Sequence, residues 1–100
     1  MSYYAVVAVT PTNEDWIPGY VEAVTQMVEQ HGGKYLARTA SHERLEGHGE
    51  VPAIMVIIEW PSKEAAQAFY GDPAYQPHLK ARLDGAQNHF VLVEGKDDLA

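Results

Sequence analysis

The chain has 100 residues, of which 46% are hydrophobic and 21% charged, with a formal net charge of -7 and no cysteine. Such a length predicts a single domain, residues 1–100, with one modest core. The lack of cysteine excludes a disulfide framework, a thiol nucleophile and a thiolate zinc site. Seven scattered basic residues do not form the positive surface that nucleic acid requires. Since no apolar run approaches the roughly 20 residues of a membrane helix, we expect a cytoplasmic protein with no nucleic-acid or membrane partner.

The first predicted strand, Tyr3 to Val9, is rich in β-branched and aromatic residues and is apolar on both faces. A helix is predicted to follow, because Thr12 or Asn13 can cap its N-terminus and apolar residues then recur at the spacing of one helical stripe. This helix is expected to end at Gly32, a residue suited to the left-handed cap.

A two-residue period from Lys34 predicts a second strand that runs toward Leu45. Strict alternation places Tyr35 on one face of this strand and Arg38 on the opposite face. The stretch from Ser41 to Pro52 contains two glycines and a proline, which indicates a frayed strand end and then an exposed connection.

The segment PAIMVIIEW, Pro52 to Trp60, predicts a third strand whose two faces are both apolar. Ser62 is expected to cap a helix over Lys63–Tyr70. Two nearby prolines then predict a turn and a short helix that includes Leu79, Arg82 and Leu83. A fourth strand is predicted from Asn88 to Glu94, followed by a loose tail at 96–100.

The order β-α-β-β-α-β predicts an α+β, ferredoxin-like fold, with a four-stranded antiparallel sheet and the helices on one face. The helices cover only one face, whereas the strands are apolar on both. An uncovered apolar face indicates a partner, and the simplest partner is a second copy packed sheet to sheet. We therefore expect a homodimer formed through the open sheet face.

Several segments form a familiar set: GGKYLAR, LEG, EWPSKEAAQAFYGDPAYQ, Arg82 and LVEG. They resemble the domain-of-unknown-function family 1330, and the resemblance covers nearly the whole chain. It implies the dimeric α+β barrel architecture, in which two ferredoxin-like protomers join their sheets back to back. It implies no reaction, because the wider superfamily includes cofactor-free monooxygenases, muconolactone isomerases, haem-degrading enzymes and proteins of unknown activity.

Polar-tipped aromatic and guanidinium side chains are expected around the cleft between the sheet and the helices. Such a pocket would suit a small, partly aromatic acid, because an arginine binds a carboxylate in bidentate fashion and aromatic walls bury a ring. The alternative is that the aromatic residues serve core packing and that the arginines pair with acids such as Glu59. The predicted ligand-binding residues are Tyr35, Arg38, Trp60, Tyr70, Tyr75 and Arg82.

Two histidines are candidate catalytic residues. His78 is the better candidate for a general base, because imidazole titrates near neutral pH and His78 lies one helical turn from Tyr75 and Arg82. His42 is the second. Either would suit a cofactor-free isomerase or oxygenase of small aromatic or dicarbonyl compounds. This enzyme is the second hypothesis for the function. The leading hypothesis is a small-molecule-binding protein, and the third is a module that only dimerises.

No cofactor or metal is expected. His42, His48 and Glu50 form a loose set of metal-ligand types, but a connection with two glycines does not preorganise them. The chain also lacks a phosphate-binding glycine loop, a nucleophile elbow and a dinucleotide fingerprint.

Overall fold

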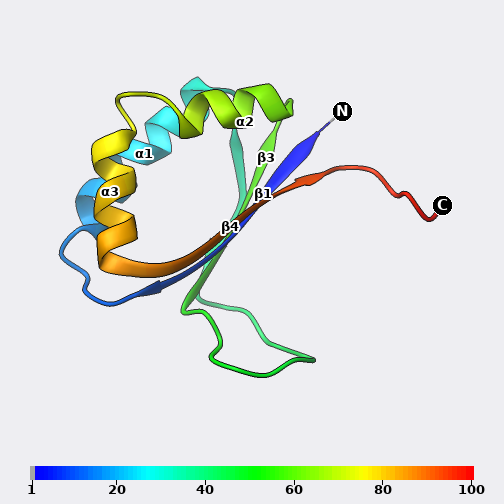
Figure 1. Ribbon diagram of the computed structural model, residues 1–100, viewed down its shortest axis with the longest axis horizontal. Helices are drawn as coiled ribbons and strands as arrows, with labels where there is room; N and C mark the ends of the chain where they lie inside the picture. Colours follow the sequence, from blue (N-terminus) through cyan, green and yellow to red (C-terminus); the bar gives the residue numbers. More distant parts are fainter. Residues whose placement is uncertain (1) are drawn as a thin grey trace.

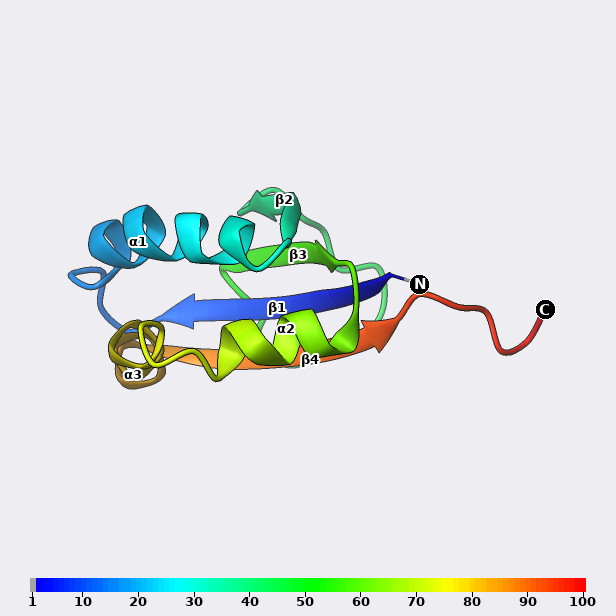
Figure 2. The same ribbon diagram turned by 90° about the horizontal axis from the view of Figure 1, so that it is seen from above.

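The computed structural model describes residues 2–100. Four strands form one antiparallel sheet in the order β2-β3-β1-β4. Three helices lie on a single face of that sheet (Figures 1 and 2). The predicted ferredoxin-like α+β fold is thus confirmed, with a third helix between α2 and the last strand. The elements are β1 (Tyr3–Pro11), α1 (Ile17–Gln30), β2 (Lys34–Thr39), β3 (Ile54–Trp60), α2 (Lys63–Tyr70), α3 (Gln76–Gly85) and β4 (Ala86–Glu94).

The start of α1 differs from the prediction that Thr12 or Asn13 would cap it. The helix begins at Ile17, and its N-cap residue Trp16 makes no side-chain cap bond. The indole Nε1 of Trp16 instead donates to the backbone oxygens of Asn13 (2.9 Å) and Gly85 (3.1 Å). The Thr12 amide also donates to the Gly85 oxygen, at 2.8 Å. The end of α3 therefore fixes the entry to α1, which local sequence cannot reveal.

The second strand is shorter than predicted, because β2 ends at Thr39 and does not continue toward Leu45. Gly47 and Gly49 have φ angles of 108° and 90° in the connection that follows, a region of backbone space that other residues rarely adopt. At the start of α2 the predicted cap is confirmed, since the Ser62 hydroxyl accepts from the Ala65 amide at 3.1 Å.

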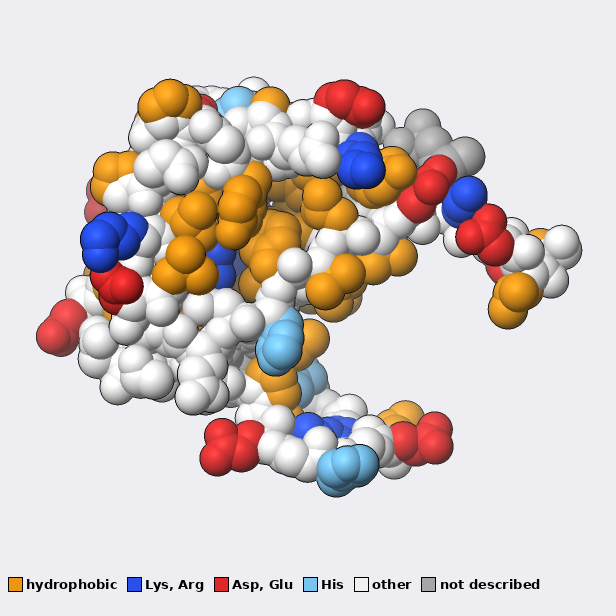
Figure 3. All heavy atoms as spheres, in the orientation of Figure 1, with side chains coloured by type: hydrophobic (Ala, Val, Ile, Leu, Met, Phe, Trp, Pro, Cys, Tyr) orange, Lys and Arg blue, Asp and Glu red, His pale blue; other side chains and the backbone are white. Residues whose placement is uncertain are grey.

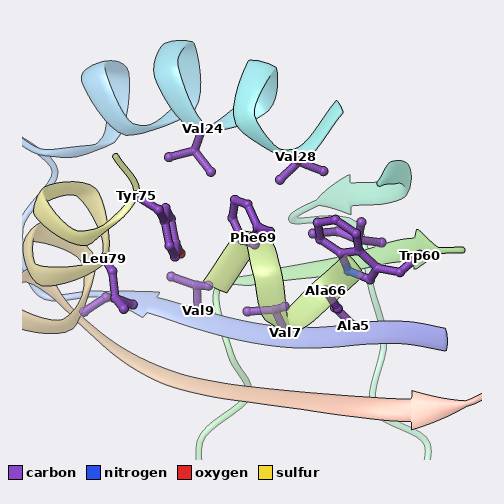
Figure 4. Close-up of a cluster of buried hydrophobic side chains, with 12 residues drawn as sticks. Ala5, Val7, Val9, Val24, Val28, Trp60, Ala66, Phe69, Tyr75 and Leu79 are labelled. Atoms are coloured by element: carbon purple, nitrogen blue, oxygen red, sulfur yellow. The ribbon is translucent and has the colours of Figure 1, made fainter. Parts of the chain in front are cut away.

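The core lies between the helices and the facing side of the sheet, where alternate residues of β1 point upward to meet α1 and α2 (Figure 4). Trp60 is fully buried at the end of β3. Its ring occupies the space beside Gly33, where an added Cβ would lie 2.9 Å from the indole and 2.7 Å from Val28 Cγ1. The close approach of a tryptophan to the turn after α1 thus requires glycine there.

The opposite side of the sheet carries apolar side chains with no helix over them. Val91 and Val93 of β4 are 54% and 45% exposed. The β2–β3 connection and the C-terminal segment both project to this side (Figure 1), and they flank a hollow beside the sheet (Figure 3). We call this surface the open sheet face; its apolar residues are Tyr4, Val6, Ala8, Met55, Ile57, Val91 and Val93.

Within residues 2–100, no helix is long and apolar enough to cross a membrane.

Candidate functional site

A cavity of about 120 Å³ lies between α1 and the covered face of the sheet. A water molecule needs only about 10–15 Å³ of such space, so the cavity has room for a small organic molecule. Aliphatic side chains of α1, β1 and β3 form most of its lining. The lining residues with polar or charged groups are Trp16, Tyr20, Tyr35, Arg38 and Arg82.

Arg82 of α3 is a buried cation, with only 3% of the residue exposed. Its Nε donates to the hydroxyl of Tyr20 at 3.2 Å, and its Nη2 donates to the hydroxyl of Tyr75 at 3.3 Å. The two hydroxyls are themselves hydrogen-bonded at 2.8 Å. Its Nη1 is buried and has no partner among residues 2–100. One wall of the cavity is therefore formed by a buried guanidinium with one donor nitrogen unsatisfied.

No carboxylate neutralises this guanidinium in the part of the chain that the structure describes, where the salt bridges involve only His31, Lys80 and Lys96 as cations. Glu59, suggested as a partner by the sequence, instead accepts from Ser2 Oγ at 3.2 Å and from the Tyr4 hydroxyl at 3.4 Å. The alternative that acids of the chain pair with the arginines is therefore wrong.

The ionisation of this cluster is set by burial and by neighbouring phenols. Burial lowers the pKa of Arg82, but Tyr20 and Tyr75 outweigh that effect, so its pKa lies above the ordinary value and the side chain stays charged. Burial also raises the pKa of Tyr20 far above the usual value for tyrosine. At neutral pH the cluster thus holds the charged Arg82 guanidinium beside the neutral hydroxyl of Tyr20, an arrangement that attracts an anion.

Arg38 of β2 forms the solvent end of the cavity. Its guanidinium carbon lies 4.0 Å from the centre of the Tyr35 ring, and its Nη1 donates to Thr25 Oγ1 at 2.8 Å. Thr25 in turn donates to the Val21 oxygen at 2.6 Å. Arg38 and Val21 are the exposed members of the lining, so the cavity opens between α1 and the edge strand β2.

The position of Arg38 corrects the prediction that it faces away from Tyr35. Tyr35 pairs with Ile58 and Arg38 pairs with Val56, with a bulge between Tyr35 and Ala37. The bulge adds one residue to β2 and so returns Arg38 to the face of Tyr35. Strict two-residue alternation failed here because it assumes an unbroken ladder.

The predicted ligand-binding residues occupy different places. Tyr35, Arg38 and Arg82 line the cavity, and Tyr75 is fully buried behind Arg82, reaching it through its hydroxyl. Trp60 is also fully buried but lies outside the lining.

Tyr70 borders a separate, more open depression on the surface between α2 and β4, where its ring meets the Phe90 ring edge-on at 5.4 Å. Hydrophobic side chains gather around this depression at the β4 edge of the molecule (Figure 3). Phe90 borders both this depression and the cavity, and so separates the two.

Neither candidate histidine lines the cavity. His78 is half-buried on α3, and His42 holds the β2–β3 connection by a 2.7 Å hydrogen bond between its Nε2 and the Pro52 oxygen. Within residues 2–100, no group of three or more His, Cys, Asp or Glu side chains is placed to hold a metal ion.

Two residues of the site were not singled out by sequence reasoning. Tyr20 and Trp16 appear in the sequence only as members of the apolar stripe of α1, yet their rings meet edge-on at 5.3 Å beside Arg82's end of the cavity. The available signal was the hydroxyl of Tyr20 and the indole N–H of Trp16 within an otherwise apolar stripe, because such groups need hydrogen-bond partners when they are buried.

Comparison with known proteins gives a family and a fold. The family described as "Domain of unknown function (DUF1330)" matches residues 2–96. The ESX-3 secretion system protein EccE3 of Mycobacterium tuberculosis is 36% identical over 67 residues. That match covers 62% of this chain but only 20% of EccE3, so the chain corresponds to about a fifth of that relative.

Among solved structures, a protein of unknown function from Rhodopseudomonas palustris matches with a TM-score of 0.80 at 18% identity, over 96% of this chain and 83% of the other. A dimeric ferredoxin-like protein of unknown function from Jannaschia sp. CCS1 matches with a TM-score of 0.70 at 15% identity, over 94% of this chain and 99% of the other. A mutant of SnoaB, a cofactor-independent oxygenase from Streptomyces nogalater, matches with a TM-score of 0.69 at 15% identity, over 98% of this chain and 96% of the other. Identities this low establish a shared fold and no shared activity.

Proposed function

The chain belongs to the DUF1330 family, and from that premise we propose that it is a homodimeric protein that binds a small carboxylate, with an aromatic or other apolar body, in the cavity between α1 and the sheet. The family carries no assigned reaction, so the proposal rests on the chemistry of the cavity.

One observation carries it: the lining of the cavity is mostly apolar, and the buried Arg82 guanidinium in that lining has an unpaired Nη1 and no carboxylate partner among residues 2–100. A buried, uncompensated cation costs several kcal/mol. A bound carboxylate offsets that cost by accepting from Nη1, while the aliphatic walls bury its body. An uncharged ligand would leave the guanidinium without a counterion.

The open sheet face supports the homodimer. Half-exposed valines of β4 continue an apolar surface across β1 and β3, and contiguous exposed apolar surface of this kind usually marks an interface. The similar protein from Jannaschia is described as dimeric. A second copy placed in the hollow between the β2–β3 connection and the C-terminal segment (Figure 3) would lie against this face of the sheet.

A second candidate is a cofactor-free enzyme acting on a small aromatic or dicarbonyl compound, favoured by the likeness to the cofactor-independent oxygenase SnoaB. His78 or His42 would then shuttle the proton. Since both lie outside the cavity lining, a substrate would have to extend beyond the cavity to reach them. Oxygen consumption or isomerisation of a bound compound, lost in His78→Gln, would favour the enzyme; binding without turnover favours the binding protein.

The test is calorimetric titration and thermal shift with phenylacetate, and with phenylacetamide as its uncharged match. A ligand at a hundred times its Kd stabilises the folded state by about 2.7 kcal/mol, which gives a clear rise in melting temperature. We expect the acid alone to bind, and Arg82→Met to abolish binding. Arg44→Ala serves as the control, because Arg44 bonds the backbone of the β2–β3 connection at Gly49 and Glu50, outside the cavity lining. Equal binding of acid and amide would contradict the proposal.

A further inference from the structure

Two of the chain's three arginines line this one cavity. Among residues 2–100, no acidic side chain lines it, although acidic residues outnumber basic ones fourteen to seven in the whole chain. The two arginines differ in surroundings, since Arg82 is buried and Arg38 is exposed. The second cation therefore needs an explanation that a single carboxylate does not give.

The sheet register shows how far apart the backbone positions of Arg38 and of Phe90, the neighbour of Arg82, lie. Arg38 is paired with Val56, Val56 with Val7, and Val7 with Phe90, so these four residues form one row across the sheet. Adjacent strands are about 4.8 Å apart, which makes the row about 14 Å long between its end backbones. The Arg82 guanidinium carbon lies 5.8 Å from the Phe90 ring centre. The arginines thus stand over opposite ends of the row, with two valines between them.

We propose that the ligand of this cavity is a dianion: two carboxylates, or chemically similar acidic groups, separated by one ring or a few carbon atoms. The inference rests on the proposed carboxylate binding and adds its second contact. The inner carboxylate accepts from Nη1 of Arg82, the apolar body lies over Val7 and Val56, and the outer carboxylate meets Arg38 at the mouth.

Arg38 is prepared for that role by its neighbours. Thr25 holds one nitrogen of the guanidinium and the Tyr35 ring supports its plane. Among residues 2–100, Arg38 forms no salt bridge. Preorganisation of this kind lowers the entropy cost of a bidentate contact. Because water reaches Arg38, its contribution to affinity is smaller than that of Arg82 and is screened by salt.

The experiment compares benzene-1,4-dicarboxylate with its monomethyl ester, which has the same body and one charge fewer. Glutarate and its monomethyl ester form the aliphatic pair. With the wild-type protein we expect each dicarboxylate to bind about threefold to tenfold more tightly than its monoester. Raising the salt concentration should reduce that ratio.

Variants assign the preference to a residue. Arg38→Ala should bring the affinity ratio of dicarboxylate to monoester close to one. Arg38→Lys, which keeps the charge, should retain part of the preference for the dicarboxylate, and Arg44→Ala should retain all of it. Arg82→Met should weaken both members of each pair. Unfolding midpoints of all variants show that a lost preference is not lost folding.

The outcomes separate the two levels of the proposal. If monoester and dicarboxylate bind wild type equally, and binding still depends on Arg82, the dianion inference is wrong while carboxylate binding stands. If no member of either pair binds, or binding is indifferent to Arg82, both are overturned. A preference for the dicarboxylate that survives in Arg38→Ala would also overturn the assignment of the outer contact.

Discussion

The two faces of the sheet are built from the same strands and are both apolar, yet their surroundings differ completely. On one face, Ala5 and Val7 of β1 are buried beneath helices, whereas on the other Val91 and Val93 of β4 are about half exposed. The covered face also encloses a cavity with charged residues at both ends. An apolar strand pattern therefore identifies a surface that needs a partner, but does not identify the partner.

The largest effect should come from breaking the covered face. Replacing Trp60 by alanine removes a fully buried ring that fills the space beside Gly33 and packs on Phe69, whose ring centre is 5.3 Å away. We expect a loss of about 3–5 kcal/mol in the free energy of unfolding, measured by urea titration. A loss below 1 kcal/mol would mean that the indole is not part of the packed core.

Breaking the open face should change assembly instead of folding. Val91→Glu places a carboxylate on the apolar surface, and a symmetric dimer formed through that surface would bury two such carboxylates in one interface. Like charges in an interface cost several kcal/mol, so the dimer dissociation constant should rise about a hundredfold. Sedimentation of the variant across a dilution series measures the change.

Leu83 provides the matched control, because it lies on α3 and is 54% exposed, the same fraction as Val91. Leu83→Glu should sediment like the wild type. Dissociation by both variants, or by neither, would contradict a dimer formed through the open sheet face.

A smaller effect is expected inside the cavity, where stability and binding should respond in opposite directions. Arg82→Met exchanges an uncompensated buried cation for an apolar chain of similar length, and the Tyr20 and Tyr75 hydroxyls keep their mutual 2.8 Å hydrogen bond. Without ligand, the variant should be as stable as the wild type or about 1–2 kcal/mol more stable, by urea titration. A clear destabilisation would show that the guanidinium is a structural group and not a binding one.

The sequence predicted what depends on local patterns. Apolar runs and alternation located the four strands, although β2 ends at Thr39 and not near Leu45, and Ser62 was correctly identified as the cap of α2. The N-terminus of α1 was missed because its partner is the Gly85 oxygen, 69 residues away from Trp16. Such contacts have no local sequence signal.

The site was predictable in composition and not in arrangement. Both arginines were assigned to ligand binding, but Arg38 reaches the cavity only through a bulge in β2 that alternation does not reveal. Tyr20 was missed because its ring fits the apolar stripe of α1, and only the fold brings its hydroxyl within 3.2 Å of Arg82. Side-chain chemistry can be read from a sequence, whereas pairing across distant segments requires the register.

The smallest effect concerns the rim of the covered face, where His31 Nε2 meets Asp72 Oδ2 at 2.9 Å and links the end of α1 to the turn before α3. The hydrogen bond from His31, followed by that from the Ala74 amide, lowers the pKa of Asp72 below its usual 3.8. A carboxylate with a lowered pKa in the folded state stabilises the fold above pH 3.8, and this stabilisation is lost as the pH falls through the lowered value.

The urea midpoints of wild type and Asp72→Asn should therefore differ near neutral pH and converge below pH 3.8. Asp84→Asn, which removes the exposed partner of Lys80, should show little difference at any pH. A gap between wild type and Asp72→Asn that persists unchanged into acid would mean that the carboxylate's charge plays no part in joining α1 to the turn.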